Sequence, residues 1–266
     1  MNASIAPGRW FRATVLTIVG LVFAIPLVGM LEFTLRTQGG GHGLAHWADL
    51  LHPAKPQAYA PLWQGLRNSL ILAVATVAVV MIVVAPTMVL VQLRFARLRR
   101  LLEFVCLLPI ALPAIALVVG LAPVYLVIGR AFGTGIWSLA FAYGISCLPF
   151  AYRALQANLD AVDTKTLAEA ARSLGAGWGT VLLRVIAPNV RRGLMLAALI
   201  AVAVVLGEFT IASLLNRQNL QTALFVVSHI DPYVAVIMSL LSLVLVFILL
   251  LVIDRVGRLL TLRAGR

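Results

Sequence analysis

The sequence predicts an all-α polytopic membrane protein with six transmembrane helices and one long polar loop on the cytoplasmic side. The 266 residues are 62% hydrophobic and only 11% charged, and their mean hydropathy is +1.03. A soluble domain is roughly half apolar and about a quarter charged. The apolar residues also form long runs, and the basic residues concentrate in alternate connections between those runs. The composition therefore excludes a soluble single-domain enzyme and a disordered chain.

Six apolar runs are long enough to cross a bilayer as helices, which requires about 20 apolar residues each. They are residues 13–35, 69–93, 104–128, 136–155, 194–215 and 234–253. Strands of a membrane barrel are about half as long and alternate polar with apolar side chains, so these runs predict helices. The first run is longer than the apolar core of a signal peptide, and no cleavage site follows it, so we expect a retained helix.

Prolines and glycines predict where the spans bend and where an outer loop lies. The outer loop 36–68 is rich in both residues and is expected to hold one short amphipathic turn at 44–51. The third run contains three prolines, which indicate a span packed inside the bundle, because neighbouring helices must satisfy the backbone groups that proline frees. Single prolines predict bends in the second and fourth runs. These prolines are Pro109, Pro113 and Pro123 in the third run, Pro86 in the second and Pro149 in the fourth.

The basic residues orient the chain. With a cytoplasmic N-terminus, 16 of the 21 Lys and Arg residues lie in inside segments. The five outside are Arg36, Lys55, Arg67, Arg130 and Arg217. The positive-inside rule then predicts that both termini are cytoplasmic. The net charge of +12 is explained as an orientation signal, so no nucleic-acid partner is expected.

The inside loop 156–193 is the most polar part of the chain. Asp163 is the expected N-cap and Gly175 the expected C-terminal stop for a helix between them. The spacing places four small or apolar side chains of this helix on one face. They are Leu167, Ala170, Ala171 and Leu174. A second short helix is expected at 178–186, before Pro188, and a solvated connecting loop is the alternative.

The same loop contains a spaced motif: Glu169-Ala170-Ala171, three residues, Gly175, nine residues, then Val185-Ile186-Ala187-Pro188. It resembles the EAA motif of permease subunits of binding-protein-dependent ABC importers, with Val185 and Ala187 as apolar departures from that pattern. Further similarity lies in Asn68-Ser69, Arg94 to Arg97, Leu108-Pro109 and Leu112-Pro113. The chain is thus similar to permeases with the methionine-importer-like six-helix fold, and most similar to the spermidine/putrescine group.

The resemblance implies a domain organisation and a set of partners. Residues 1–61 hold the first helix and the outer loop, 62–255 the permease core, and 256–266 a basic cytoplasmic tail. The loop becomes a cytoplasmic coupling-helix loop in which Glu169, Ala170, Ala171 and Gly175 contact an ATPase subunit. The implied assembly has two ATPases, a second permease (identical or homologous) and an extracytoplasmic solute-binding protein, in the bilayer of a bacterial plasma (inner) membrane.

The chain itself is not expected to bind ATP. Its only lysines, Lys55 and Lys165, follow Ala54 and Thr164, whereas a phosphate-binding P-loop requires glycine before the lysine. ATP and Mg are therefore expected on the partner ATPase, and this chain is expected to have no enzymatic activity, no resident cofactor and no metal site.

Glu208 is the clearest charge inside an apolar run. A carboxylate there is costly and is usually functional or paired. We interpret Glu208, Phe209 and Thr210 as lining the solute pathway; the alternative is a structural hydrogen bond, with Arg130 or Arg217 as candidate partners. The resemblance of this segment favours a polyamine substrate, with ferric iron, thiamine or an aminophosphonate as alternatives. An intramembrane enzyme and a passive channel are the rival classes.

Overall fold

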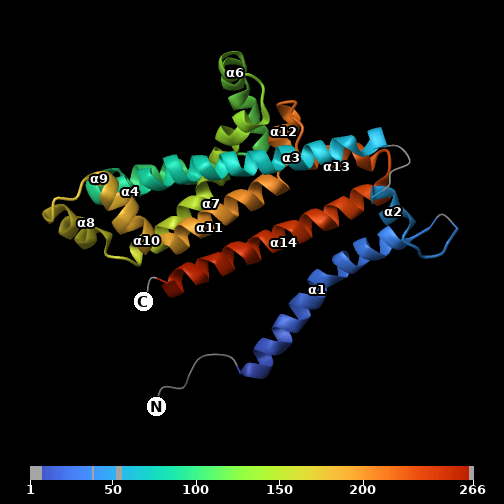
Figure 1. Cartoon of the computed structure of the whole chain (residues 1–266), viewed down its shortest axis with the longest axis horizontal. Helices are drawn as coiled ribbons and strands as arrows, with labels where there is room; N and C mark the ends of the chain where they lie inside the picture. Colours follow the sequence, from blue (N-terminus) through green and yellow to red (C-terminus); the bar gives the residue numbers. More distant parts are fainter. Residues whose placement is uncertain (1–7, 38, 52–55, 264–266) are drawn as a thin grey trace. The chain divides into compact units, whose positions relative to one another are not determined.

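The structure is a computed structural model that describes residues 8–37, 39–51 and 56–263. The described residues form helices and no β-strand, which confirms the predicted fold class (Figure 1). The chain divides into two compact units. One comprises Met1–Ala60 with Leu224–Leu243, and the other comprises Pro61–Ala223 with Val244–Arg266.

The first unit contains α1 (Arg9–Leu35) and α2 (Ala45–Leu51), which match the first predicted span and the predicted short turn. The ring of Tyr233 stacks on Phe33 at 4.8 Å and on His46 at 4.0 Å between centroids. The Trp47 indole donates a hydrogen bond to Thr34 Oγ1 (3.2 Å). These contacts hold α2 and the start of α14 (Pro232–Arg263) on the end of α1.

The second predicted span is a long helical stretch with a local widening. It consists of α3 (Pro56–Val79), the π-helical turn η1 (Val80–Val84) and α4 (Ala85–Arg94). Pro86 follows the π turn directly. Proline has no N–H and its ring collides with the carbonyl four residues earlier, so a wider turn relieves the conflict without ending the span. The π turn thus accommodates Pro86, and residues 59–94 remain one continuous helical stretch.

The third predicted span is not one helix. Residues 99–132 form α5 (Arg99–Ala111) and α6 (Ala114–Phe132), which are separated at Leu112 and Pro113. Leu112 has an extended backbone (ψ 128°), as expected for a residue that precedes proline. Pro113 then serves as the N-cap of α6. Pro109 and Pro123 lie inside these helices without ending them.

The helices observed for the fourth, fifth and sixth apolar runs also differ from the predicted spans. After the 3-10 turn η3 (Ile136–Leu139), α7 (Ala140–Asp160) continues through Pro149. The fifth run is broken into α11 (Arg191–Gly207) and the short α12 (Thr210–Leu214). The helix α13 (Leu220–Ser228) was not predicted, and α14 extends beyond the sixth run at both ends.

Four described helical stretches are long and apolar enough to cross a membrane, or five if one bent pair forms a single span. They are Trp10–Leu35, Tyr59–Arg94, Ala114–Phe132 and Pro232–Val252, and the bent pair is Trp178–Asn189 with Arg191–Gly207. α7 has sufficient length, but its polar second half lowers its hydropathy. The protein is therefore polytopic, and the count of six spans stays a prediction.

The core of the second unit forms where α7 packs along α11 (Figure 1). Small buried residues line this contact, and Val80 of the π turn packs against them. They are Cys147, Ala151, Ala197 and Ala201. In lipid, small residues stabilise a helix pair because they let the backbones approach closely.

Gly193 marks the tightest point of this contact. A Cβ at Gly193 would lie 2.8 Å from the Cβ of Asn158 on α7. We therefore expect Gly193→Ala to force α7 and α11 apart and to destabilise the protein by about 1–3 kcal/mol. Thermal unfolding in detergent should show a lower Tm, by about 2–4 °C for each kcal/mol.

The matched control is Gly120→Ala in α6, where an added Cβ has no atom within 4 Å. It should keep or raise the Tm, because alanine favours helix over glycine. An unchanged Tm for Gly193→Ala would contradict the close packing of α7 on α11.

Candidate functional site

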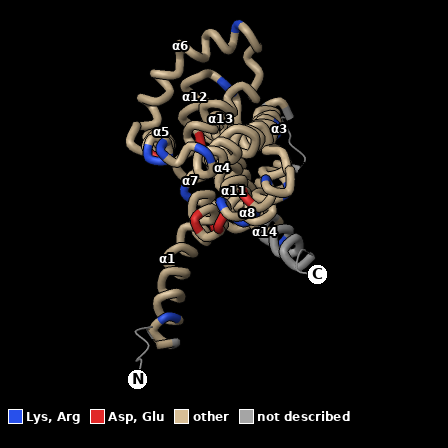
Figure 2. The backbone as a smooth tube through the Cα atoms, turned by 90° about the vertical axis from the view of Figure 1, so that its left-hand side faces the viewer, with Lys and Arg blue, Asp and Glu red and all other residues tan. Residues whose placement is uncertain are grey.

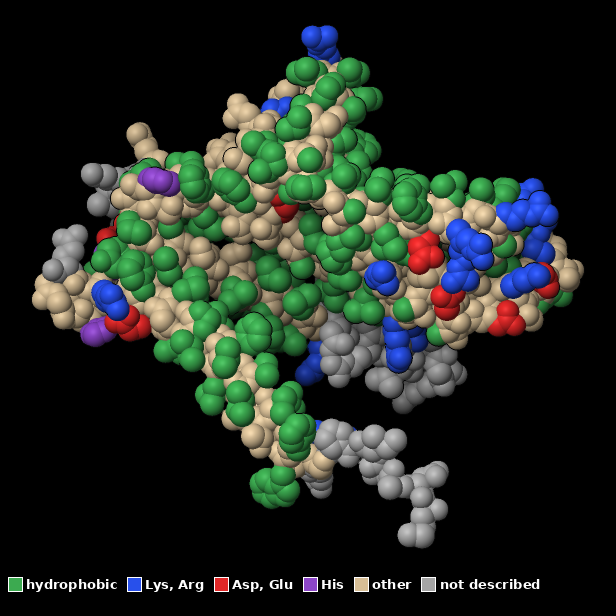
Figure 3. Space-filling model, turned by 180° about the vertical axis from the view of Figure 1, so that it is seen from behind, with side chains coloured by type: hydrophobic (Ala, Val, Ile, Leu, Met, Phe, Trp, Pro, Cys, Tyr) green, Lys and Arg blue, Asp and Glu red, His purple; other side chains and the backbone are tan. Residues whose placement is uncertain are grey.

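Charged residues gather at one end of the second unit, around α4, α5 and α8 (Thr164–Ser173) (Figures 2 and 3). This end contains the loop 156–193 that the sequence singled out. The rest of the unit's visible surface is mainly apolar, as expected for helices that face lipid. The charged end is therefore the part of the unit suited to lie at or beyond the surface of the membrane.

The helix α8 begins and ends where the sequence predicts. Asp163 is its N-cap, and Asp163 Oδ1 accepts a hydrogen bond from the Thr166 N–H at 3.2 Å. Hydrogen bonds from Thr166, through its side chain and its backbone N–H, hold the pKa of the Asp163 carboxyl below its ordinary value. The cap is therefore ionised and formed at neutral pH and is lost only as the pH falls through that lowered pKa.

Gly175 ends α8 in a Schellman arrangement. The Gly175 N–H donates to Arg172 O (2.9 Å), and the Ala176 N–H donates to Ala171 O (3.0 Å). This geometry requires a left-handed residue, and Gly175 has φ +84°. The glycine of the motif is thus needed for its backbone conformation, because a side chain there would meet no neighbouring atom.

α8 turns one face into the unit and the other outward, and the division differs from the predicted face. Thr164 and Ala168 are buried, and Leu167 and Ala171 pack against the core below them. Glu169 and Ala170 are exposed, and Leu174 is 90% exposed. The expectation that Leu167, Ala170, Ala171 and Leu174 share a face is wrong, because the inward stripe runs through positions 164, 168 and 171.

The second helical segment of the loop also forms. It runs through α9 (Trp178–Thr180), the π turn η4 (Val181–Ile186) and α10 (Ala187–Asn189). Val181 and Ile186 are buried beneath α8. The chain then bends by 82° into α11. The loop is therefore an ordered helical hairpin and not a solvated connection.

A polar network attaches the base of α8 to three other helices. Gln92 of α4 donates to Leu159 O (3.3 Å) and Thr164 Oγ1 (3.4 Å). Gln156 of α7 donates to Gln92 Oε1 (3.1 Å) and Asp160 Oδ1 (2.9 Å). The Arg99 guanidinium at the start of α5 contacts both oxygens of Asp160 at 2.9 Å. A displacement of α8 is thus opposed directly by α4 through Gln92, and indirectly by α7 and α5 through Gln156, Asp160 and Arg99.

A second attachment surrounds Trp178. The guanidinium of Arg172 on α8 lies 5.3 Å from the Trp178 ring centroid, and that of Arg94 at the end of α4 lies 5.9 Å from it. Such cation–π contacts contribute about 0.5–2 kcal/mol each, depending on exposure. Arg172 also donates to Ala176 O (3.0 Å), which braces the turn after α8. The outer end of the loop is therefore joined to the same α4 as its base.

Glu208 lies at the break between α11 and α12 and is partly buried. Both carboxylate oxygens lie 3.0 Å from the Ile211 N–H, so Glu208 caps α12. The Tyr143 hydroxyl of α7 lies close enough to Glu208 to interact electrostatically with its carboxylate. The candidate partners Arg130 and Arg217 are wrong: neither forms an ion pair with Glu208 within the part of the chain that the structure describes. Phe209 is 37% exposed and Thr210 is partly buried.

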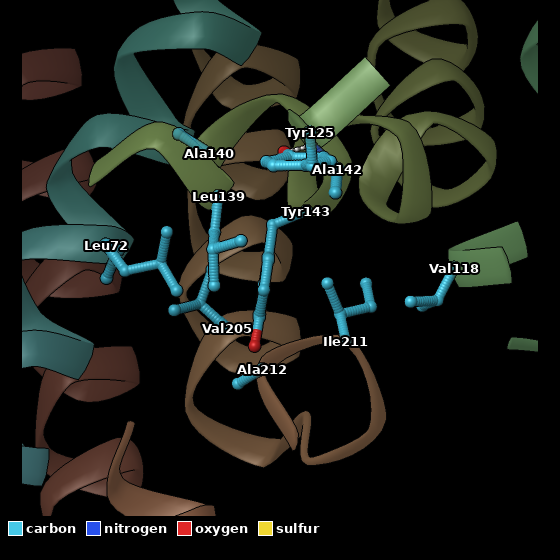
Figure 4. Close-up of a cluster of buried hydrophobic side chains, with 11 residues drawn as sticks. Leu72, Val118, Tyr125, Leu139, Ala140, Ala142, Tyr143, Val205, Ile211 and Ala212 are labelled. Carbon is cyan, nitrogen blue, oxygen red and sulfur yellow. Dashed lines mark hydrogen bonds between the residues drawn. The ribbon is translucent and has the colours of Figure 1, made fainter. Parts of the chain in front are cut away.

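Two amide side chains satisfy carbonyl groups that the break leaves without helical partners. Asn219 donates to Glu208 O (2.7 Å) and to the Tyr143 hydroxyl (3.1 Å). Gln221 donates to Leu206 O (2.6 Å). Figure 4 shows the Tyr143 side chain between Leu139, Val205 and Ile211 with its hydroxyl toward Ala212. The break between α11 and α12 is therefore stabilised by specific side-chain hydrogen bonds.

The segment that supplies these amides is itself fixed to α3. Asn68 donates to Gln218 O (2.8 Å), and Ser69 Oγ accepts from the Leu220 N–H (2.9 Å). Gly65 permits this approach, because a Cβ there would lie 2.7 Å from Asn219 O. Asn68 and Ser69, which belong to the sequence resemblance, thus hold the Glu208 region in place.

Sequence reasoning missed Gln92, Gln156, Tyr143, Asn219 and Gln221. Their common signal is an uncharged polar side chain in or beside an apolar run, a type that hydrogen-bonds between helices in membranes. The predicted residues Glu169, Ala170, Ala171 and Gly175 are brought together on α8 and its terminal turn. Glu208, Phe209 and Thr210 are consecutive at the α11–α12 break.

The comparison with protein families identifies the chain. Residues 82–265, more than half of the chain, match the family described as "Binding-protein-dependent transport system inner membrane component". A search of the curated proteins finds no match. The matched range includes α8, the polar network at its base and the α11–α12 break. The chain therefore belongs to this family and is a multi-pass inner-membrane permease subunit of a binding-protein-dependent ABC importer.

Proposed function

We propose that the permease couples to a separate ATPase subunit through the outward face of α8. The observation that supports this role most directly is the exposure of Glu169 and Ala170 on a helix whose opposite face is fixed in the core. Alanine lets a partner approach the backbone closely, and the Glu169 carboxylate accepts charge-assisted hydrogen bonds. Its ion pair with Lys165 is long (3.9 Å) and exposed, so Glu169 remains available to a partner.

The proposed assembly follows the family. Two ATPases bind ATP and Mg on the cytoplasmic side, a second permease (identical or homologous) completes the pathway, and an extracytoplasmic binding protein delivers the solute. Both termini of this chain are cytoplasmic, as the basic residues predict. Nucleotide-driven movement of the ATPases displaces α8 and biases two arrangements of the helices.

The displacement of α8 reaches the spans through its two attachments to α4. The first is the network of Gln92, Gln156, Asp160 and Arg99, and the second is the clamp of Arg94 and Arg172 on Trp178. Because α4 continues into α3 through the π turn, a movement at Gln92 is applied to the whole 59–94 span. We expect these contacts to stay formed while α8 moves.

For the solute, we propose a polyamine that passes near Glu208. The partly buried carboxylate at a break between helices supports this proposal, because it gives a polycation a negative group at a point where the backbone is irregular. Ferric iron, thiamine and an aminophosphonate are the alternatives. Retention of an ATPase subunit on purification, with ATP-dependent uptake, would exclude both rival classes, an intramembrane enzyme and a passive channel.

The first prediction concerns the turn after α8. Gly175→Leu should misplace the end of α8, because a side chain is strained by about 1–2 kcal/mol at φ +84°. We expect ATPase activity in the reconstituted complex to continue while uptake for each ATP hydrolysed falls several-fold. Gly177→Leu is the control, because Gly177 has φ −70° and an added Cβ has no atom within 4 Å. Normal coupling in an assembled Gly175→Leu complex would refute the role of this turn.

The second prediction concerns Gln92. Gln92→Leu removes its hydrogen bonds to Leu159 O of α7 and to Thr164 Oγ1 of α8, so uptake for each ATP hydrolysed should fall while ATPase binding is retained. The same change at exposed Gln64 serves as control. In a double-mutant cycle with Thr164→Val, the effects should be non-additive by roughly 0.5–1.5 kcal/mol. Additive effects would show that Gln92 and Thr164 do not act together.

The third prediction concerns Glu208. Glu208→Gln removes the negative charge but keeps an oxygen that accepts a hydrogen bond from the Ile211 N–H. The complex should therefore assemble with an unchanged Tm. The KM for polyamine uptake in proteoliposomes should rise several-fold. The control variant is Thr222→Ser, which keeps the local hydroxyl and adds no charge. Gln221→Glu would not serve, because it adds a negative charge. Unchanged transport kinetics would assign Glu208 to a structural role only.

A further inference from the structure

The corner between α4 and α5 is unusually rich in arginine. Four of its seven residues from 94 to 100 are arginines, all exposed: Arg94, Arg97, Arg99 and Arg100. α4 ends at Arg94, the 3-10 turn η2 (Ala96–Leu98) follows, and α5 begins at Arg99. We call residues 94–104 the arginine corner.

Two of these arginines have side-chain partners among the described residues, and two have none there. Arg99 pairs with Asp160, and Arg94 lies over the rings of Phe95 and Trp178. Among the described residues, the side chains of Arg97 and Arg100 form no hydrogen bond or ion pair, although Glu103 follows within one helical turn. Two guanidinium groups are thus free to bind an external anion.

Large apolar side chains alternate with the arginines. Phe95 is 48% exposed, Leu98 47%, Leu101 58% and Phe104 64%. This pattern is typical of a segment at the boundary of a bilayer, where apolar side chains enter the acyl region and long basic side chains reach the headgroups. A docking surface for a soluble protein would instead leave these apolar groups facing water before assembly.

We propose that the arginine corner binds the phosphate of an anionic phospholipid through Arg97 and Arg100, with Phe95, Leu98, Leu101 and Phe104 in contact with its acyl chains. Arginine suits this ligand because its planar guanidinium forms paired hydrogen bonds to phosphate oxygens. Residues three apart on a helical turn lie close enough for both groups to contact one headgroup. The charge of the surface selects an anionic lipid over a zwitterionic one.

Lipid bound at the arginine corner lies beside the contacts that hold the loop 156–193. Arg94 and Arg99, the partnered arginines of the same corner, contact the loop helices through Trp178 and Asp160. Bound lipid therefore stabilises the corner at which the loop 156–193 is attached to α4 and α5. The lipid site itself does not depend on the proposed coupling role, so its test measures binding separately from transport.

The test measures phospholipid binding to the purified permease in its complex. Native mass spectrometry and Tm are compared after addition of phosphatidylglycerol or phosphatidylcholine. We expect phosphatidylglycerol to bind and raise the Tm more than phosphatidylcholine does. Each of Arg97→Gln and Arg100→Gln should weaken phosphatidylglycerol binding roughly fivefold, and high salt should reduce the difference.

The control is Arg130→Gln, which removes an exposed arginine at the end of α6 that has no second arginine beside it. It should bind phosphatidylglycerol like the wild type. Because the Gln variants affect only exposed side chains, a folded complex is expected, and its unchanged Tm in phosphatidylcholine verifies this. A Leu101→Gln variant adds an independent readout and should weaken lipid binding without a change in charge.

Equal binding of the two lipids by the wild type would overturn the proposal. So would undiminished phosphatidylglycerol binding in the Arg97→Gln, Arg100→Gln double variant. Loss of the ATPase subunit from that variant, with lipid binding unchanged, would also overturn it and assign the arginines to the protein partner.

Discussion

The backbone polar groups of this apolar bundle must find partners inside the protein, and most of its distinctive features follow from this constraint. A carbonyl or N–H that loses its helical partner in hydrocarbon costs several kcal/mol. The chain nevertheless breaks its helices at Leu112–Pro113 and at Glu208–Phe209. At the second break, side chains replace the lost bonds: Asn219 and Gln221 donate to carbonyl groups, and Glu208 accepts from the Ile211 N–H.

The same requirement explains how the loop helices are held. Gln92 satisfies the Leu159 carbonyl near the end of α7 and at the same time contacts Thr164 at the start of α8. The side chain that satisfies a backbone carbonyl at the end of α7 therefore also attaches the start of α8. The amide and carboxylate groups at the base of α8 thus give the loop a fixed position, and its outer face remains exposed for a partner.

The sequence predicts an element well when the residues that determine it lie close together in the chain. The ends of α8 were predictable because Asp163 and Gly175 act on their own backbone or within a few residues of it. The first span was predictable because its long apolar run, with Glu32 as the only charged residue from 13 to 35, is enough to define it. The break at Leu112–Pro113 had a local signal in Pro113, but three prolines in one run left its position undefined.

Features with distant causes were not predictable. Glu208 was recognised as unusual, but its contact with Tyr143 and the support from Asn219 depend on residues 65 and 11 positions away, brought together by packing. The outward face of α8 was assigned incorrectly because spacing defines a stripe but not the side on which the core lies. Here Ala168 faces the core, while Leu174 projects outward.

The central claim is that the outward face of α8 contacts the ATPase. Its most direct test is site-specific photo-crosslinking in the assembled complex from position 170, which is exposed, compared with position 133, an exposed glycine in the loop after α6. The structure predicts a crosslink between position 170 and the ATPase subunit and none from position 133. A complex that retains its ATPase but gives no such crosslink from position 170 would contradict the claim.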